Sequence, residues 1–269
     1  MSTPITCLIL AYNEAARIHL AVRHAICWAD EVLVIDKSST DATRSIAEKL
    51  GARVVTIPFS KQGHESYPEM VRHASHDWIW GFTAGEVPTR KCIEVGRAIL
   101  REDAETVDLI CVPMHYFSFG IHSAKSPWAG GWQPRLYHRH RVTFTGLVHD
   151  PIRGLRTARI DHAPGIHVLH QTHAAAESFI GSHADYAIAE AAPGDAHDRL
   201  RHAFFQIQAY DEAFNADPAL LGQQIGWKLY WLMVALHAWQ RINPGISAAY
   251  SSRAENVLVS EWLTSPPPA

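Results

Sequence analysis

The sequence predicts an α/β fold in which a mainly parallel sheet is followed by a helical C-terminal extension. In the N-terminal half, short apolar runs alternate with segments of helical periodicity, which is the pattern of successive βαβ units. After residue 173 the pattern becomes helical, and turns containing Pro and Gly separate the helical stretches. With 269 residues, 47% of them hydrophobic, the chain can bury a substantial core.

Five short apolar runs are predicted to form strands, at residues 5–10, 31–36, 53–57, 78–82 and 108–113. Helices are expected between them, over residues 14–28, 41–50, 69–76 and 89–101. The second of these helices begins with Ser, Thr and Asp residues, which suit the capping of free N–H groups.

From 114 to about 166 the pattern is irregular and rich in aromatic, Gly, His and Arg residues, which is typical of loops and short strands that form a site. Four further helices are predicted, over residues 174–192, 197–215, 220–242 and 248–263. We therefore expect a sheet domain over 1–170, a helical region over 171–263 packed on it, and a disordered tail over 264–269.

Composition excludes some classes of function. The formal net charge of −3 predicts no surface for nucleic acid or another polyanion. The four cysteines are scattered, and Cys7 and Cys111 lie in apolar runs, which favours buried reduced thiols and a cytoplasmic location. The N-terminus lacks the basic start and the long apolar run of a signal peptide.

The stretch 225–242 is rich in Trp, Leu and Tyr on nearly every face. It is short for a membrane span and is interrupted by Lys228 and His237. We expect this helix to be buried against its neighbours or in a homodimer. Because Trp and Tyr favour the lipid interface, peripheral contact with the inner membrane surface is the alternative.

Three polar clusters follow predicted strands, at residues 11–14, 36–38 and 83–86. In doubly wound sheets, ligands bind at the carboxyl ends of the strands. Neither GxGxxG nor GxxxxGK[ST] occurs, which disfavours dinucleotide oxidoreductases and P-loop enzymes. Asp36 can accept a hydrogen bond from a ribose hydroxyl or a base imide, or it can cap the next helix, the role that we expect of Asp41.

Four segments together carry a resemblance to a known family: AYNEAARI, WADEVLVID, GGW and VHD. Over roughly residues 5–150 the chain resembles family 2 glycosyltransferases of the GT-A fold, and within them the bacterial sugar transferases that extend lipopolysaccharide cores. The resemblance implies a nucleotide-sugar-binding and catalytic domain over 1–170. It also implies that the nucleotide, usually uridine, is held by Ala11, Asn13, Glu14 and Asp36.

The resemblance is incomplete at the metal-binding DxD motif. In that family two aspartates, often written DADE, hold Mg²⁺ or Mn²⁺ on the donor pyrophosphate. Here the segment reads Thr83-Ala84-Gly85-Glu86, so both aspartates are missing and the motif is degenerate. Glu86 can hold a divalent ion only with other ligands, such as His149. Otherwise cationic side chains must meet the charge of the departing diphosphate, and the candidates are Lys125, Arg135, Arg139 and Arg141, each of which also suits an ordinary surface.

The GGW and VHD segments supply the remaining candidates. Trp132 offers a flat apolar face to a sugar ring, or else is a buried Trp in a turn. With Arg135 and Arg139 it is predicted to contact the diphosphate or the acceptor. The resemblance places Asp150 as the general base and His149 as a metal ligand or diphosphate contact. The histidines of HVLHQTH alternate in direction if the segment is a strand, which argues against a zinc site.

Two hypotheses of function follow. The first is an inverting glycosyltransferase that moves a sugar from a nucleoside diphosphate, usually UDP, to a glycan, a lipid-linked sugar or a small molecule. The second is a non-catalytic nucleotide-sugar-binding protein that acts as a regulator or partner subunit. The missing aspartates favour the second and the VHD segment favours the first. A nucleotidyltransferase ranks last, because the chain has no early phosphate loop rich in Gly, Arg and Lys.

Overall fold

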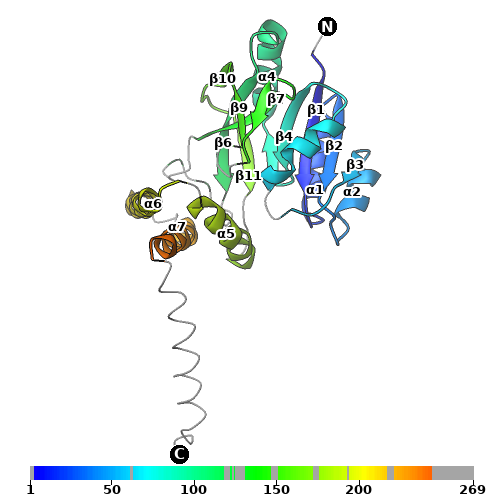
Figure 1. The fold of residues 1–269 in the computed structure, drawn as a ribbon. Coiled ribbons are helices and arrows are strands. Elements are labelled where there is room, and N and C mark those ends of the chain that lie inside the picture. Colours follow the sequence, from blue (N-terminus) through cyan, green and yellow to red (C-terminus); the bar gives the residue numbers. More distant parts are fainter. Residues whose placement is uncertain are drawn as a thin grey trace, which may run out of the picture.

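A nine-stranded sheet forms the centre of the N-terminal half (Figure 1). The computed structural model describes residues 3–60, 63–117, 122, 124, 131–146, 151–171, 176–192, 194–216 and 221–243. Along the sheet the strands follow the order β3-β2-β1-β4-β7-β6-β11-β5, and β10 also pairs with β6. Five of its eight strand pairings are parallel, which confirms the prediction of a mainly parallel sheet.

The five predicted strands all form, and four of them are apolar runs that the sheet buries, while β3 lies at the edge of the sheet with its residues exposed or half-buried. The first four are β1 (Ile5–Ala11), β2 (Glu31–Asp36), β3 (Arg53–Thr56) and β4 (Trp78–Thr83). The fifth, β6 (Leu109–Phe117), runs four residues beyond its predicted end at 113. The remaining strands are β5 (Glu86–Pro88), β7 (Trp132–His138), β8 (Val142–Phe144), β9 (Ile152–Gly154), β10 (Thr157–Arg159) and β11 (Val168–Gln171).

The first three helices of the sheet domain are shorter than the sequence predicts, whereas the fourth matches its predicted range to within two residues. They are α1 (Ile18–Ile26), α2 (Thr43–Lys49), α3 (Tyr67–Met70) and α4 (Arg90–Asp103). The helix expected over 69–76 is replaced by α3 and a 3-10 turn at Val71–His73. Here Arg139 donates to the carbonyls of Val71 and Ala74, so these oxygens are bonded to a side chain from β7's end rather than to a continuing helix.

Helices cover both faces of the sheet (Figure 1). On one face, α1, α2 and α4 pack against the sheet through residues such as Val22, Ala47 and Ile93. On the other face, α3 and the β8–β9 pair bury Met70 and Ile152. The strands between these layers are buried on both sides, and this double burial holds their carboxyl ends in a common register.

Three long helices follow the sheet domain, as predicted: α5 (Ala176–Ala191), α6 (Ala196–Ala216) and α7 (Leu221–Ile242). They share a core that contains Tyr210, Tyr230 and Trp231. The opposite side of α7 exposes apolar residues at heptad spacing, namely Ile225, Leu229, Leu232, Leu236 and Trp239. Within the described part of the chain, no helix combines the length and apolar character needed to cross a membrane.

Several predictions for the C-terminal region remain untested. The membrane or homodimer contact through these helices stays a prediction, as does the division into domains near residue 170. The helix predicted over 248–263 and the tail over 264–269 lie outside the described residues.

Candidate functional site

The carboxyl ends of β1, β2 and β4 meet at one edge of the sheet. In the parallel register, Ala11 is opposite Asp36 and Leu10 is opposite Thr83. The structure therefore brings together the three polar clusters that follow these strands. This is the edge at which ligands bind in open α/β sheets.

Hydrogen bonds connect the loop after β1 to the loop after β2 at this edge. The Asn13 backbone N–H donates to Ser39 Oγ at 2.9 Å, and Asn13 Oδ1 accepts from the Thr40 N–H at 2.8 Å. Asn13 and Ser38 have φ values of +53° and +60°, which non-glycine residues rarely adopt. Backbone strain of this kind gathers at functional sites, where the surrounding contacts enforce it.

The two carboxylates after β2 have different surroundings. Asp36 is 2% exposed, and both of its oxygens accept from the Ser39 N–H at 3.2 Å. Asp41 accepts from the Thr43 N–H at 2.9 Å and the Ala15 N–H at 3.0 Å, so it has the capping role that the sequence predicts. A carboxylate has about four acceptor positions, so the Asp36 side chain retains capacity for a ligand donor.

An aromatic pair that sequence reasoning missed lies at the same edge. The rings of Tyr12 and Phe59 are 4.5 Å apart between centroids, and both residues are exposed. Lys37 Nζ lies 5.1 Å from the Phe59 ring centroid, and burial lowers the pKa of its ammonium group. Tyr12 lies inside the AYNE segment, and this position in the motif could have predicted that its ring lies at the candidate site.

Glu14 is occupied by an intramolecular partner, Arg17, which the sequence reasoning also missed. Arg17 donates to both Glu14 oxygens, with Nη2 at 2.8 Å from Oε1. The third guanidinium nitrogen, Nη1, donates to the Gln171 carbonyl at 3.0 Å. Arg17 thus links the end of β1 to the end of β11, and the i,i+3 spacing from Glu14 was the signal for the pair.

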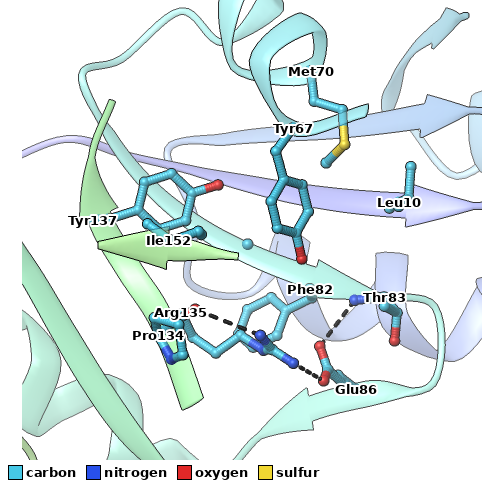
Figure 2. A pocket seen from close by; sticks show the side chains of 11 residues that line it. Leu10, Tyr67, Met70, Phe82, Thr83, Glu86, Pro134, Arg135, Tyr137 and Ile152 are labelled. Carbon is cyan, nitrogen blue, oxygen red and sulfur yellow. Dashed lines mark hydrogen bonds and ion pairs between the residues drawn. The ribbon is translucent and has the colours of Figure 1, made fainter. Parts of the chain in front are cut away.

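Glu86 is completely buried and both of its oxygens are engaged (Figure 2). Arg135 Nη2 donates to Oε1 at 2.6 Å, and the Thr83 N–H donates to Oε2 at 3.0 Å. Burial raises the pKa of the Glu86 carboxyl, but the Arg135 charge, the neighbouring His170 and the hydrogen bonds from Arg135 and Thr83 together outweigh burial and hold this pKa below its usual value. Glu86 is therefore an ionised carboxylate whose counter-charge is Arg135.

His170 completes this buried cluster. Its Nδ1 lies 3.2 Å from Glu86 Oε1 without the alignment of a hydrogen bond, and has no hydrogen-bond partner among the described residues. Burial lowers the pKa of the His170 imidazole, so the ring is neutral near pH 7. The sequence reasoning considered His170 only as a zinc ligand.

A shift in strand register aims Arg135 at Glu86. In the pairing of β6 with β7, Ile110 is opposite Leu136 and Cys111 is opposite Pro134, so the ladder skips Arg135. Such β-bulges occur beside active sites and redirect a side chain. Arg135 is 12% exposed at its side chain, and its Nε has no hydrogen-bond partner in the described part of the chain.

Arg135 and Glu86 line a pocket of about 310 Å³, including its open mouth (Figure 2). The pocket opens between the ends of β1, β4 and β7 on the face that α3 covers, and Tyr67 and Tyr137 point their hydroxyl groups into it. Burial raises the pKa of both phenols, so both remain protonated. None of the four predicted nucleotide-binding residues lines this pocket, but their neighbours Leu10 and Thr83 do.

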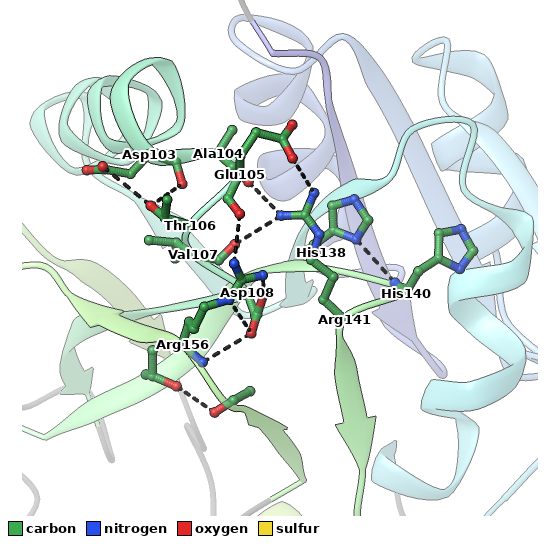
Figure 3. Close-up of polar contacts among 12 residues, drawn as sticks. Asp103, Ala104, Glu105, Thr106, Val107, Asp108, His138, His140, Arg141 and Arg156 are labelled. Atoms are coloured by element: carbon green, nitrogen blue, oxygen red, sulfur yellow. Dashed lines mark hydrogen bonds and ion pairs between the residues drawn. The ribbon is translucent and has the colours of Figure 1, made fainter.

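Two predicted residues lie elsewhere. Arg139 pairs with Asp77 at 2.9 Å, before β4 begins, so it lies at the end of the sheet opposite to Thr83. Arg141 also lies at that end, where it donates to the Ala104 carbonyl at 2.6 Å (Figure 3). The structure therefore does not bring Arg139 or Arg141 to the edge where the three polar clusters meet.

Trp132 lies at the start of β7 and is partly exposed. Its Nε1 donates to the Ile160 carbonyl at 2.9 Å, and its ring centroid is 4.3 Å from that of His162. The indole is thus held in place by its N–H while part of its face is open, and its contact with an acceptor stays a prediction. His149, Asp150 and Lys125 lie outside the described residues, so their predicted roles also stay predictions.

The residues present at the turn after β4 do not fit a divalent cation. Thr83, Ala84 and Gly85 carry no carboxylate, and the two Glu86 oxygens already accept from Arg135 and Thr83. Over the described ranges, no group of three or more His, Cys, Asp or Glu side chains is arranged to hold a metal ion.

Comparison with known proteins places this site in context. The sequence model described as Glycosyl transferase family 2 matches residues 6–162. An uncharacterized glycosyltransferase of Rickettsia bellii is 41% identical over 87 residues, which are 32% of this chain and 29% of that protein. The chain thus spans about three tenths of the length of the curated relatives it matches.

Two solved structures are similar to this chain. S. aureus TarS in complex with UDP-GlcNAc is 15% identical, with a TM-score of 0.47 and coverage of 84% of this chain and 78% of that chain. Mycobacterium tuberculosis glucosyl-3-phosphoglycerate synthase with Mn²⁺, UDP and glucosyl-3-phosphoglycerate is 17% identical, with a TM-score of 0.46 and coverage of 69% and 78%.

The family match covers more than half of the chain and confirms the resemblance that the four motifs predicted. The observed sheet, with its helical C-terminal region, confirms the predicted GT-A type α/β fold.

Proposed function

Since the chain belongs to glycosyl transferase family 2, we propose that it transfers a sugar from a nucleoside diphosphate, UDP in the first instance, to a hydroxyl acceptor. The observation that carries this proposal is the meeting of three polar strand ends at one edge of the sheet. That edge combines a buried carboxylate, strained loop backbone and an open pocket, which is the composition of a ligand site.

The nucleoside binds at the ends of β1 and β2 in this proposal. Asp36 accepts from the base imide or the ribose, since its buried carboxylate retains unused acceptor positions. The backbone of Ala11 and Asn13 lines one side of the nucleoside site, and the ion pair between Glu14 and Arg17 holds this loop in place. The exposed Tyr12 ring is available for stacking against the base.

In this proposal, the VHD segment carries out the proton transfer. Asp150 removes the proton from the acceptor hydroxyl, and the acceptor oxygen attacks the anomeric carbon from the face opposite the diphosphate, which inverts the configuration. Trp132 lines the acceptor side, where a glycan, a lipid-linked sugar or a small molecule is the substrate class. His149, which precedes Asp150 in the sequence, is assigned to the diphosphate in this proposal.

The nucleoside site is tested by calorimetric titration with UDP and by thermal stabilisation with a panel of UDP-sugars. Asp36→Asn is expected to weaken UDP binding about tenfold, because a buried acceptor becomes an amide. Asp103→Asn, an exposed carboxylate in α4, serves as the matched control and leaves affinity unchanged. UDP affinity that is equal in both variants rejects the assignment of Asp36.

The base is tested by turnover of the same UDP-sugar panel. Asp150→Asn is expected to lower turnover by about 10²–10⁴-fold with unchanged UDP affinity. Full turnover in this variant rejects Asp150 as the base.

A second candidate function is a non-catalytic nucleotide-sugar-binding protein. Thr83 and Gly85, at the two aspartate positions of the DxD motif, favour it. Thermal stabilisation by a UDP-sugar without hydrolysis or transfer, across glycan, lipid-linked and small-molecule acceptors, supports this candidate over the enzyme.

A further inference from the structure

The position of the second DxD aspartate has no room for a side chain. A Cβ atom built on Gly85 would lie 2.6 Å from the Gln171 carbonyl oxygen and 3.0 Å from Arg17 Nη1. A separation below 3 Å from backbone cannot be relieved by rotating a side chain. The aspartate is therefore not merely absent here, because the space beside Gly85 is already taken by the Gln171 carbonyl and the Arg17 guanidinium.

The carboxylate that remains at this turn is likewise committed to an arginine. Glu86 holds Arg135 Nη2 at 2.6 Å, and the β-bulge brings this guanidinium to the pocket wall (Figure 2). A guanidinium carries five N–H donors. Glu86 takes one of them, the Pro134 carbonyl lies 3.5 Å from Nη1, and Nε is buried without a partner among the described residues.

Resting on the proposed function, we infer that Arg135 takes the place of the divalent cation and binds the diphosphate of the donor, while Arg17, whose three guanidinium nitrogens all donate to Glu14 and Gln171, fills the space beside Gly85. Two guanidinium groups flank the turn where the family holds its metal ion, one beside Gly85 and one beside Glu86. The planar guanidinium matches the oxygens of a phosphate group and keeps its charge at any physiological pH. Arg135 is held by the Glu86 carboxylate, which fixes its direction before the ligand arrives.

The transfer step requires no further protein group. The bond between the anomeric carbon and the diphosphate oxygen breaks, and its electron pair leaves with the nucleoside diphosphate. A bond forms from the acceptor oxygen to the anomeric carbon, and the acceptor proton passes to the base. The negative charge that develops on the leaving diphosphate is the charge that Arg135 meets.

The experiment compares UDP with uridine in calorimetric titrations of the full chain in the presence of EDTA. Uridine reports the nucleoside site, and the ratio of the two affinities isolates the diphosphate. We expect UDP to bind at least about tenfold more tightly than uridine without any divalent ion, and added Mn²⁺ to change this ratio less than about twofold. Turnover of a UDP-sugar is expected to be equally insensitive to EDTA.

Arg135→Lys keeps the charge but removes the fork of donors, so it is expected to lower the UDP-to-uridine ratio about tenfold and leave uridine affinity unchanged. Arg156→Lys is the matched control, because Arg156 also pairs with a buried carboxylate, Asp108, but at the other end of the sheet (Figure 3). It should leave the ratio unchanged.

Three results overturn the inference. One is a UDP-to-uridine ratio near unity in EDTA that rises with Mn²⁺, and another is turnover that EDTA abolishes and Mn²⁺ restores. The third is a ratio in Arg135→Lys equal to that of the Arg156→Lys control. In these cases uridine still binds, so the proposed function survives; loss of uridine binding itself removes the proposed function and this inference with it.

Discussion

The two ends of the sheet each contain an arginine paired with a buried carboxylate. At the carboxyl end of β4, Arg135 pairs with Glu86, whose side chain is completely buried. At the opposite end, just before β6, Arg156 pairs with Asp108, whose side chain is 4% exposed (Figure 3). The arginines differ more, because Arg156 is 50% exposed at its side chain and Arg135 only 12%.

The two arginines also differ in how many of their guanidinium nitrogens donate hydrogen bonds. All three guanidinium nitrogens of Arg156 donate, two to Asp108 and one to the Glu105 carbonyl. In Arg135, Nη2 bonds Glu86 while the buried Nε has no partner in the described part of the chain. The same ion pair is thus a completed structural contact at one end and a donor group with unused capacity at the other.

The largest effect that distinguishes the two ends is expected from removing the carboxylate. Glu86→Gln leaves the Arg135 charge buried without a counter-charge and is expected to lower the free energy of unfolding by about 3–5 kcal/mol. Asp108→Asn is expected to lower it less, because Arg156 keeps half of its side chain in water. Urea denaturation of both variants checks this order, and equal losses would remove the distinction between the two ends.

Gly85→Ala probes the crowding at the carboxyl end. The added methyl group meets the Gln171 carbonyl, so we expect the free energy of unfolding to fall by up to about 3 kcal/mol. Thermal denaturation measures the loss, and the matched change Ala84→Gly reports the cost of altering the same turn without adding an atom. A Gly85→Ala protein as stable as the parent would contradict the close approach of Arg17 and Gln171.

At the opposite end, Glu31 begins β2 and predicts a response to acid. Burial raises the pKa of its carboxyl, but hydrogen bonds from Thr6, Ser75 and Arg53 outweigh this and lower the pKa from 4.5 to about 2. The stabilisation is therefore complete above pH 4.5 and is lost as the pH falls towards about 2.

Glu31→Gln removes this response and is expected to cost about 1–2 kcal/mol of unfolding free energy at pH 7. Unfolding free energies measured from pH 7 to pH 2.5 should fall more steeply for the parent than for the variant. Parallel curves would place the acid sensitivity elsewhere.

The smallest effect on stability is expected at the carboxyl end, where His115 responds in a different pH range from Glu31. His115 in β6 stacks on His167 at 3.8 Å and on His122 at 4.5 Å between ring centroids. Burial, followed by these imidazoles and His162, lowers the pKa of His115 from 6.5 to about 4. The unfolded chain therefore binds this proton more readily, so His115 destabilises the fold as the pH falls from 6.5 towards 4.

His115→Asn should leave the free energy of unfolding at pH 7 within about 0.5 kcal/mol of the parent value. Between pH 6.5 and pH 4 its stability should fall less steeply than that of the parent. Identical slopes would contradict the lowered pKa of His115.

The local sequence pattern was sufficient to predict most of the sheet and the edge of the sheet where the candidate site lies. The apolar runs at β1, β2 and β4 identify buried parallel strands, and polar residues directly after them identify the carboxyl edge. The short lengths of α1, α2 and α3 and the position of Arg139 were not predicted. Arg139 is only four residues from Arg135, but four residues of strand span about 13 Å, which carries it to the other end of β4.

By itself, then, the sequence determined the fold class and the family, and it predicts that the two aspartates of the metal-binding motif are missing. Only the tertiary structure decided what fills their place, because Arg135 meets Glu86 across 49 residues and Arg17 reaches the Gln171 carbonyl across 154. Apolar periodicity is a property of neighbouring residues and can be read along the chain. A contact between distant residues depends on strand order and on one skipped residue in a ladder, and neither leaves a mark in local sequence.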